Sequence, residues 1–306
     1  MQADVASELP ESVSARSRPC VGGIRRAVLG LAPIAGADLV HGLDVDLPIH
    51  PRHLTVSTVH DVAVFDTPWA FSGVRSRGER LLMRRAVRRA DSVLAVSDFT
   101  AQRVWELFRR EATVTLLAPA SHFAPPGEAA ADRVRQAYKL PAQFVLHVGT
   151  VEPRKNLARL ADVCSTVPVP LVLAGGVAAG SVVPPGARHL GYVPMVDLAA
   201  LYASATVVAY PSLYEGFGLP PLEAMACGAP VVASRVGALP AVLGEAALLV
   251  PPGDDEALRR ALVDVLHDAP RRAALAEAGL AKARGMTWAS TAERTLDVYR
   301  RLGISC

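Results

Sequence analysis

Residues 210–228 decide the fold, and they read YPSLYEGFGLPPLEAMACG. They begin with the last residue of the apolar, β-branched run Thr206–Tyr210, which predicts a buried strand. They close on a short helix, because Pro220 and Pro221 suit a first helical turn. A glycine-bearing loop connects the two, and its backbone N–H groups and the helix N-terminus can hold an anion such as a diphosphate.

Two carboxylates bracket this loop, Glu215 within it and Glu223 about one turn into the helix. A carboxylate beside a diphosphate is repulsive unless it has another task, and accepting hydrogen bonds from sugar hydroxyls is the obvious one. The strand, the anion-binding loop and the two hydroxyl acceptors together predict a nucleotide-sugar site. A glycosidase acid and nucleophile pair is an alternative. It is weaker because the loop between the glutamates suits an anion.

Strands and helices alternate along the chain on both sides of this stretch. Strand-like runs occupy residues 37–41, 54–59, 92–96, 144–148, 171–174, 206–210, 230–233 and 246–250. Helical patterns include an arginine-rich helix before residue 92 and residues 98–109, 196–205, 221–226, 255–267, 270–284 and 289–301, with another from about residue 156. The alternation predicts an α/β fold with doubly wound parallel sheets. Ligands bind beyond the carboxyl ends of such strands, and His60, Gly149 and the Glu215 loop all follow strand ends.

The chain of 306 residues is long enough for two domains. The proline- and glycine-bearing stretch 116–139 is the best candidate for a linker. We therefore expect an N-terminal acceptor-side domain over residues 1–139 and a C-terminal nucleotide-sugar domain over residues 140–306. The division would give each half its own sheet.

The composition describes a globular protein, with 51% hydrophobic and 20% charged residues. A net charge of +3 and the lack of a basic tail argue against a nucleic-acid partner. No apolar run approaches the ~20 residues of a membrane span, and the N-terminus lacks the pattern of a secretory signal. The four scattered cysteines suit reduced thiols, so a cytoplasmic location is expected.

Four motifs follow one another in the chain: His60-Asp61, residues 148–156 (VGTVEPRKN), residues 191–194 (GYVP), and Glu215 and Glu223 around GFGLPP. Together they resemble, in the same order, the motifs of the retaining glycosyltransferases of family 4, over roughly residues 36–301. The resemblance implies a GT-B fold, in which two Rossmann-like doubly wound parallel-sheet domains face a cleft. It also implies that the last helix packs back on the N-terminal domain.

Arg154 and Lys155 follow a strand and begin a helix, and their charges could neutralise the diphosphate facing the Glu215 loop. By resemblance, Lys155 matches the family's phosphate-binding lysine. Some members carry an arginine near the position of Thr150; this chain does not, and Arg154 is the residue that could act instead. The resemblance further implies that Glu215 contacts the donor sugar and Glu223 the ribose hydroxyls.

It also implies that His60 contacts the donor sugar or the acceptor from the N-terminal domain, a role that suits a histidine. The segment Tyr192-Val193 would offer backbone groups to the nucleobase. The candidate catalytic residues are His60, Glu215, Arg154 and Lys155, and the candidate donor-binding residues are Gly149, Thr150, Tyr192, Val193, Gly216, Phe217, Gly218, Leu219 and Glu223.

Several of these candidate residues also have an ordinary structural interpretation. A histidine at a strand end is often structural, Asp61 suits a turn or cap, and basic residues at a helix start are often merely solvated. The pair Asp44-x-Asp46 is similar to the Asp-x-Asp metal site of GT-A transferases. We reject it because the pair lies in a turn before Pro48 and basic residues with a helix N-terminus already neutralise phosphates. No metal ion or other cofactor is expected.

By resemblance the reaction retains anomeric configuration. Similarity to mannosyltransferases of polysaccharide assembly makes GDP-mannose the first donor expected, with UDP- or dTDP-sugars next. The acceptor would be a hydroxyl of a glycan or of a polyprenyl-linked saccharide. The arginine-rich stretch Arg75–Arg89 could contact anionic lipid at the inner face of the membrane, although a solvated helix is the simpler interpretation.

One departure from the family concerns the start of the chain. Family members begin with a strand and a glycine-rich loop, whereas Val21-Gly22-Gly23-Ile24 has the glycines without a preceding strand. The N-terminal domain is therefore expected to be incomplete. On this ground an inactive sugar-nucleotide-binding or partner-binding module stays open as an alternative. A GT-B epimerase acting on a nucleotide-sugar, which would share the fold but need no separate acceptor, is a third option.

Overall fold

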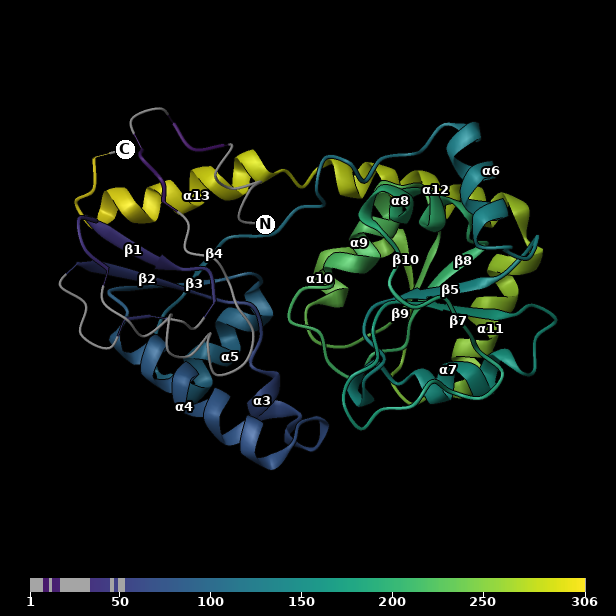
Figure 1. The fold of residues 1–306 in the computed structure, drawn as a ribbon, viewed down its shortest axis with the longest axis horizontal. Helices are drawn as coiled ribbons and strands as arrows, with labels where there is room; N and C mark the ends of the chain where they lie inside the picture. The colour runs from purple at the N-terminus through teal and green to yellow at the C-terminus, as the bar shows by residue number, and fades with distance from the viewer. Residues whose placement is uncertain (1–7, 11–12, 17–33, 45–46, 49–52, 306) are drawn as a thin grey trace. The chain divides into compact units, whose positions relative to one another are not determined.

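The computed structural model describes residues 8–10, 13–16, 34–44, 47–48 and 53–305. The chain forms two compact units, the first comprising Met1–Leu117 with Thr287–Cys306 and the second Ala118–Met286. Each unit contains a parallel sheet with helices on both faces (Figure 1). The α/β class with parallel sheets, predicted from the alternation of strands and helices, is confirmed.

Among the described residues, the first unit holds a four-stranded parallel sheet in the order β1-β2-β3-β4. The strands are β1 (Leu39–Gly42), β2 (Leu54–Val59), β3 (Ser92–Ala95) and β4 (Thr113–Val114). The helices are α3 (Ala63–Asp66), the 3-10 turn η1 (Pro68–Ala70), α4 (Gly73–Arg89), α5 (Asp98–Phe108) and α13 (Trp288–Arg301). Helices α4 and α5 lie on one side of the sheet and α13 on the other (Figure 1).

The last helix, α13, packs on the sheet of the first unit. Val298 joins Val56 and Leu94 in a buried apolar cluster. His41 Nδ1 lies 2.6 Å from the hydroxyl oxygen of Tyr299. The helix therefore belongs to the first unit, although the whole second unit precedes it in the chain.

The second unit carries, within its described residues, a six-stranded parallel sheet in the order β10-β9-β8-β5-β6-β7. The strands are β5 (Val145–Val148), β6 (Leu171–Ala174), β7 (Arg188–His189), β8 (Val207–Tyr210), β9 (Val231–Ser234) and β10 (Ala247–Val250). The helices are α6 (Glu128–Ala137), α7 (Leu157–Cys164), α8 (Met195–Ser204), α9 (Leu219–Ala226), α10 (Leu239–Leu243), α11 (Asp255–His267) and α12 (Ala269–Arg284), with 3-10 turns η2 (Pro153–Lys155) and η3 (Gly244–Ala246).

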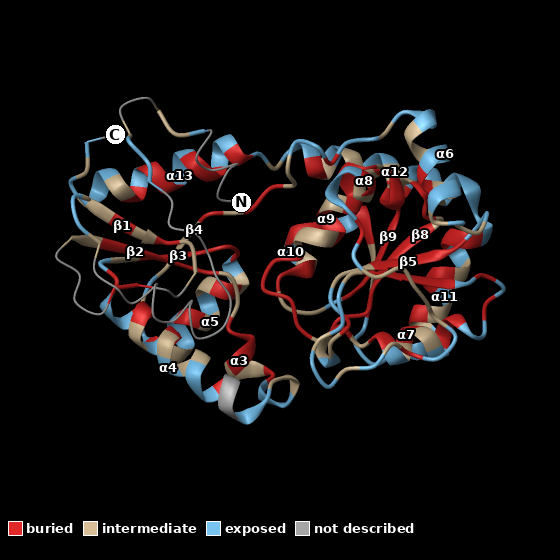
Figure 2. Cartoon of the chain, in the orientation of Figure 1, coloured by how far each residue is buried: buried red, intermediate tan, exposed pale blue. Residues whose placement is uncertain are grey.

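The order of the strands places a switch point between β5 and β8. From β5 the chain adds β6 and β7 on one side and then returns to add β8, β9 and β10 on the other. Strands β6, β8 and β9 are buried along their whole length (Figure 2), which explains their continuous apolar runs. Doubly wound sheets bind ligands beyond the carboxyl ends of the strands at such a point.

Residues 116–139, predicted to be a linker, contain the helix α6. Val134 of this helix is fully buried, and Arg135 Nη2 donates a hydrogen bond to the Ser204 carbonyl on α8 at 2.7 Å. Residues 118–139 thus lie in the second unit, whereas the sequence analysis assigned them to the N-terminal domain. The glycine and prolines in front of α6 are typical of turns, so the sequence pattern predicted a linker and the helix was missed.

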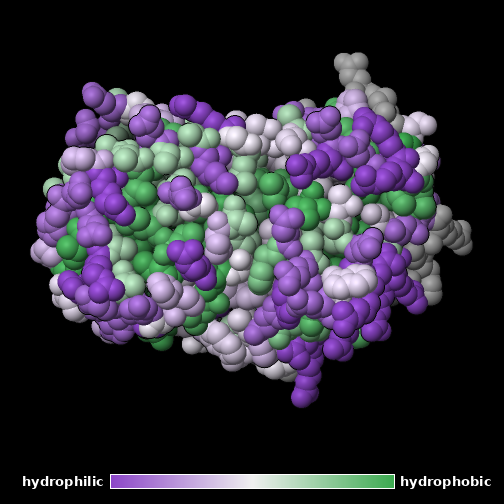
Figure 3. Space-filling view, turned by 180° about the vertical axis from the view of Figure 1, so that it is seen from behind, coloured by the Kyte–Doolittle hydropathy of each residue, from purple (hydrophilic) through white to green (hydrophobic). Residues whose placement is uncertain are grey.

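No helix in the described part of the chain is both long and apolar enough to cross a membrane. On the face drawn in Figure 3, hydrophilic residues interrupt the hydrophobic ones. The thiols of Cys164 and Cys227 are buried and unpaired. Burial raises the pKa of each to about 12, so both stay protonated and unreactive at neutral pH.

Candidate active site

The site is built where β5 and β8 end side by side. The segment after β5 runs through η2, and the segment after β8 is the loop that leads into α9. The backbone of the two segments is joined, since Leu213 N donates to the Arg154 carbonyl at 2.8 Å. Asn156, in the left-handed conformation with φ 57°, ends η2 and donates its side-chain amide to the Pro211 carbonyl at 3.3 Å. These bonds fix the position of the loop against η2.

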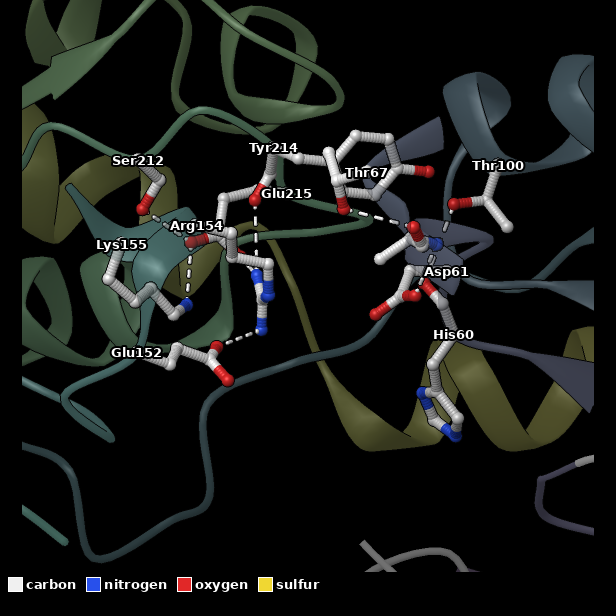
Figure 4. Close-up of polar contacts among 11 residues, drawn as sticks. His60, Asp61, Thr67, Thr100, Glu152, Arg154, Lys155, Ser212, Tyr214 and Glu215 are labelled. Atoms are coloured by element: carbon white, nitrogen blue, oxygen red, sulfur yellow. Dashed lines mark hydrogen bonds and ion pairs between the residues drawn. The ribbon is translucent and has the colours of Figure 1, made fainter. Parts of the chain in front are cut away.

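Glu215 lies at the centre of the site and is only 7% exposed. Its Oε1 accepts hydrogen bonds from Lys155 Nζ at 2.6 Å and from Ser212 Oγ at 2.7 Å (Figure 4). Arg154 Nη1 approaches its Oε2 at 3.3 Å. Burial by itself raises the pKa of Glu215, but the charges of Lys155 and Arg154 outweigh it and hold the pKa below the usual value. Glu215 is therefore an ionised carboxylate at neutral pH.

Arg154 and Lys155 are directed at the Glu215 loop. Lys155 is 7% exposed. Arg154 also donates to the Tyr214 carbonyl at 3.1 Å and pairs with Glu152 Oε1 at 2.8 Å (Figure 4). Two cations thus lie within 3.3 Å of a buried carboxylate at the carboxyl edge of the sheet. The interpretation of these residues as merely solvated is wrong.

Two glycines set the path of the loop. Gly218 precedes α9 with φ +98°, where a Cβ atom would lie 2.4 Å from Leu239 Cδ2. Gly237 has φ +53°, and a Cβ atom there would lie 2.2 Å from the Glu215 carbonyl oxygen. The backbone of the next residue, Ala238, donates to that same oxygen at 3.0 Å. Gly237 therefore brings a second loop against Glu215, a contact that side chains would prevent.

Helix α9 begins at Leu219 with prolines in its first turn, as predicted. Glu223 lies on this helix, and its Oε2 accepts a hydrogen bond from the Tyr202 hydroxyl at 3.3 Å. Burial raises the pKa of Glu223 to about 7, and the bond from Tyr202 opposes this only in part. The two glutamates that the sequence pairs thus differ, because the cations of the described ion pairs contact Glu215 and not Glu223.

The other candidate donor-binding residues lie around the same edge of the sheet. Gly149 donates its N–H to the Ala174 carbonyl at 2.8 Å, and Thr150 is exposed. Tyr192 is 80% exposed while Val193 is buried. The remaining ones, Gly216, Phe217 and Gly218, are buried in the loop, and Leu219 is partly exposed.

His60 lies in the first unit, at the end of β2. Its Nε2 is 2.7 Å from the Leu43 carbonyl oxygen and donates to it. Asp61 Oδ1 accepts a hydrogen bond from Ala63 N at 2.8 Å, in a turn that leads into α3 (Figure 4). Asp61 is thus the turn residue that the sequence allowed. Thr100 Oγ1 approaches the His60 carbonyl at 3.4 Å.

The metal and lipid hypotheses concern the first unit as well. Asp46 lies outside the described residues, and among the described residues no group of three His, Cys, Asp or Glu side chains could hold a metal ion. In α4, Arg80 Nε donates to the Val64 carbonyl at 2.7 Å, and Arg85 Nη1 to the Leu47 carbonyl at 2.8 Å. Arg80 and Arg85 therefore hold α4 to neighbouring segments of the first unit through hydrogen bonds to backbone carbonyls.

Sequence reasoning did not single out Ser212, Gly237 or Tyr202. Ser212 precedes Glu215 by three residues and could have been noted as a hydroxyl near a carboxylate. Tyr202 and Gly237 carry no local signal, because their contacts depend on how α8 and the loop after β9 pack against the site.

Comparison with known proteins places this geometry in a family. The family model for glycosyl transferases group 1 matches residues 130–282. The chain is a group 1 glycosyltransferase. It is 36% identical over 289 residues to the O-antigen chain mannosyltransferase B of Escherichia coli, covering 86% of this chain and 74% of the relative. It is 31% identical to the D-inositol 3-phosphate glycosyltransferase of Kineococcus radiotolerans, covering 84% of this chain and 66% of the relative.

Solved structures confirm the GT-B fold of this group 1 glycosyltransferase. The sucrose-phosphate synthase from Thermosynechococcus elongatus superposes with a TM-score of 0.73 at 24% identity, covering 87% of this chain and 73% of the other. The HepE protein of Anabaena, in complex with UDP-glucose, superposes with a TM-score of 0.71 at 21% identity, covering 82% and 73%. These two structures show the fold, whereas the family model and the mannosyltransferase of Escherichia coli confirm the family that the four sequence motifs indicate.

Proposed function

We propose that this glycosyltransferase is a retaining, metal-independent enzyme that transfers mannose from GDP-mannose to a hydroxyl of a glycan or polyprenyl-linked acceptor in the cytoplasm. The observation that carries the proposal is the cluster of Lys155, Arg154 and Glu215 at the switch point of the second sheet. The relative from Escherichia coli, whose name describes an O-antigen chain mannosyltransferase, supports the choice of mannose.

The donor diphosphate would bind between the cations and the first turn of α9. The first amides of a helix have no acceptor within the helix, and they favour an anion together with the helix dipole. Lys155 has three N–H donors, of which Glu215 takes one in the described contacts. The lysine could therefore contact a phosphate oxygen and still hold Glu215. Gly149, Thr150 and the loop Gly216–Leu219 would line the diphosphate and sugar.

Each carboxylate would then bind hydroxyls. Glu215, kept ionised by its cations, would accept from the donor sugar, and Glu223 from the ribose. The segment Tyr192-Val193 would contact the nucleobase. His60 would contact the sugar or acceptor from the first unit, with its Nε2 held by the Leu43 carbonyl.

Catalysis would rest on stabilising the leaving group. The negative charge on the diphosphate grows as the glycosidic bond breaks, and Arg154, Lys155 and the amides of the loop would offset it. In a retaining reaction the acceptor hydroxyl attacks on the face that the diphosphate leaves. Two cations and a helix N-terminus supply the positive charge that a metal ion provides in other transferases.

Product analysis with labelled donors tests the function. GDP-mannose, UDP-glucose and dTDP-glucose are incubated with the protein in the presence of a mannose-containing oligosaccharide. Mannosyl transfer or slow donor hydrolysis supports the proposal. An isomerised donor would indicate the epimerase, and binding without turnover the inactive module. Lys155→Ala should abolish turnover, whereas Lys282→Ala on α12 is a matched control that should retain it.

A further inference from the structure

Strands β5 and β8 separate at their carboxyl ends. Within the described residues, the last pair that joins the two strands is Leu146 with Val208. Each strand then continues beside its outer neighbour, β5 with β6 as far as Val148 and β8 with β9 as far as Tyr210. The ladder across the switch point therefore ends before the strands do, and the proposed donor site lies beyond it.

Two buried side chains cross this gap in opposite directions. His147 Nδ1, on β5, lies 2.9 Å from the Ala209 carbonyl oxygen on β8. The Tyr210 hydroxyl, on β8, donates to the Val148 carbonyl on β5 at 3.1 Å. The two rings lie against each other, with centroids 4.8 Å apart. A backbone ladder holds neighbouring strands about 4.8 Å apart. Side chains are longer, so they can join strand ends that have moved apart.

The contact with Ala209 fixes the tautomer of His147. A carbonyl only accepts hydrogen bonds, so Nδ1 must carry a hydrogen. Nε2 is buried, has no hydrogen-bond partner among the described residues, and lies 3.3 Å from where a Cβ atom on Gly149 would be. Burial lowers the pKa of His147 to about 4; the Ala209 bond and the charge of Glu215 oppose this, and the charge of Lys155 adds to it. The ring is therefore neutral at pH 7, with its hydrogen on Nδ1.

The two side chains join the segments of the proposed donor site at their base. Gly149 lies two residues beyond His147, at the start of the segment that leads to η2. Ser212, whose hydroxyl donates to Glu215, follows the end of β8. A wider gap would move the cations of the first segment away from the Glu215 loop. A diphosphate that contacts both segments would then lose part of its contacts.

We propose that His147 is a positioning residue of the donor site, whose Nδ1–H bond to the Ala209 carbonyl sets the gap between β5 and β8 at the width that a nucleoside diphosphate requires. Tyr210 supports the same gap from the opposite strand. The imidazole acts through the position of the two segments and touches no atom of the donor. The proposal rests on the proposed function, in which both segments bind the diphosphate.

The hydrogen bond is tested first in the free protein. Long-range proton–nitrogen NMR spectra distinguish a protonated ring nitrogen from one with a lone pair, and His147→Asn identifies the signals of His147. We expect a single neutral tautomer with its hydrogen on Nδ1 from pH 8 down to pH 5. A neutral ring with its hydrogen on Nε2, or a mixture of the two tautomers, would overturn the proposal, because Nδ1 could then not hold the Ala209 carbonyl.

Affinity for the nucleotide is the second test. GDP and UDP are titrated into the wild type by calorimetry, and the variants are compared with the nucleotide that binds more tightly. His147→Phe keeps a ring but cannot donate, so it should bind about fivefold more weakly, as expected for one lost hydrogen bond. His147→Asn places an amide N–H near the position of Nδ1 and should stay within about twofold of the wild type.

The matched control is His267 on α11, which is exposed and whose Nδ1 also lies near a carbonyl, that of Val263 at 3.1 Å. His267→Phe should bind the nucleotide as the wild type does. Unchanged affinity in His147→Phe, or an equal loss in both His147 variants, would overturn the proposal, because a ring that only fills the core needs no N–H donor. If His147→Phe does not fold, the tautomer and His147→Asn decide.

The same titration separates this proposal from the proposed function. Tighter binding of UDP would reject GDP-mannose as the donor, and the variants would then be compared with UDP. Binding of neither nucleotide would reject the proposed donor site and the role of His147 in it. A loss of affinity that only His147→Phe shows supports the positioning role, whichever nucleotide binds.

Discussion

Replacing Lys155 by methionine should lower the free energy of unfolding by about 3 kcal/mol at pH 7. Lys155 Nζ lies 2.6 Å from Glu215 Oε1, and the side chains of both residues are 9% exposed. Removing one partner of a buried ion pair costs roughly 3–5 kcal/mol, because the other charge stays buried without compensation. Arg154 and Ser212 still contact Glu215 in the variant, which places the expected loss at the lower end.

The loss should depend on pH. The folded-state pKa of Glu215 lies below 4.5, so the pair contributes stability above the unfolded pKa, and that stability is lost as pH falls through the folded pKa. In Lys155→Met the folded pKa of Glu215 should rise, since its nearest cation is gone. The loss of unfolding free energy in the variant, relative to the wild type, should therefore be largest at pH 7 and smaller at pH 4.5. Urea unfolding at both pH values measures this loss.

A double variant separates the ion pair from simple packing. Lys155→Met with Glu215→Gln removes both charges and should recover more than half of the lost stability. Lys282→Met is the control for replacing a lysine elsewhere, and we expect it to change stability by less than about 0.5 kcal/mol. A loss of stability that is the same at both pH values, or that the double variant leaves in place, would show that the unpaired charge of Glu215 is not its cause.

Three further outcomes are expected. Gly237→Ala should cost more than about 2 kcal/mol and weaken donor binding, because its Cβ atom meets the Glu215 carbonyl; Gly303→Ala, also at positive φ but with open space, should cost less. Calorimetric unfolding of both variants would compare them, and equal losses would contradict the clash. Glu223→Gln should make the protein more stable at pH 8, by up to about 3 kcal/mol, and change it little at pH 4, because a raised carboxyl pKa costs stability as pH rises from 4.5 to about 7; identical pH–stability curves would exclude the shift. Transfer activity should survive a chelator, and a loss restored by magnesium or manganese would revive the Asp-x-Asp pair as a metal site.

Much of the fold follows from local sequence. The bounds of β2, β6 and α11 agree with the predicted ones, because β-branched runs and a periodic helix pattern define them. The short strand β4 and the helix α6 were missed. Strand β4 has two residues and no run to detect, and α6 follows turn signals that local reasoning takes for a linker.

The position of the site could be predicted from the sequence, but the partners and charge states of its residues could not. Strand ends indicated that Lys155 and Glu215 lie at one edge of a sheet. The ion pair joins residues 60 positions apart, and it depends on β5 and β8 being neighbours, which the sequence does not fix. For the same reason the contact of Tyr202 with Glu223 could not be predicted, because it depends on the packing of α8 against α9.

A crystal structure of the protein with GDP tests the proposed donor site most directly. We expect the β-phosphate at the first turn of α9, with an oxygen within hydrogen-bond distance of Lys155 Nζ and the ribose hydroxyls on Glu223. A diphosphate bound elsewhere, with Lys155 contacting only Glu215, would contradict it.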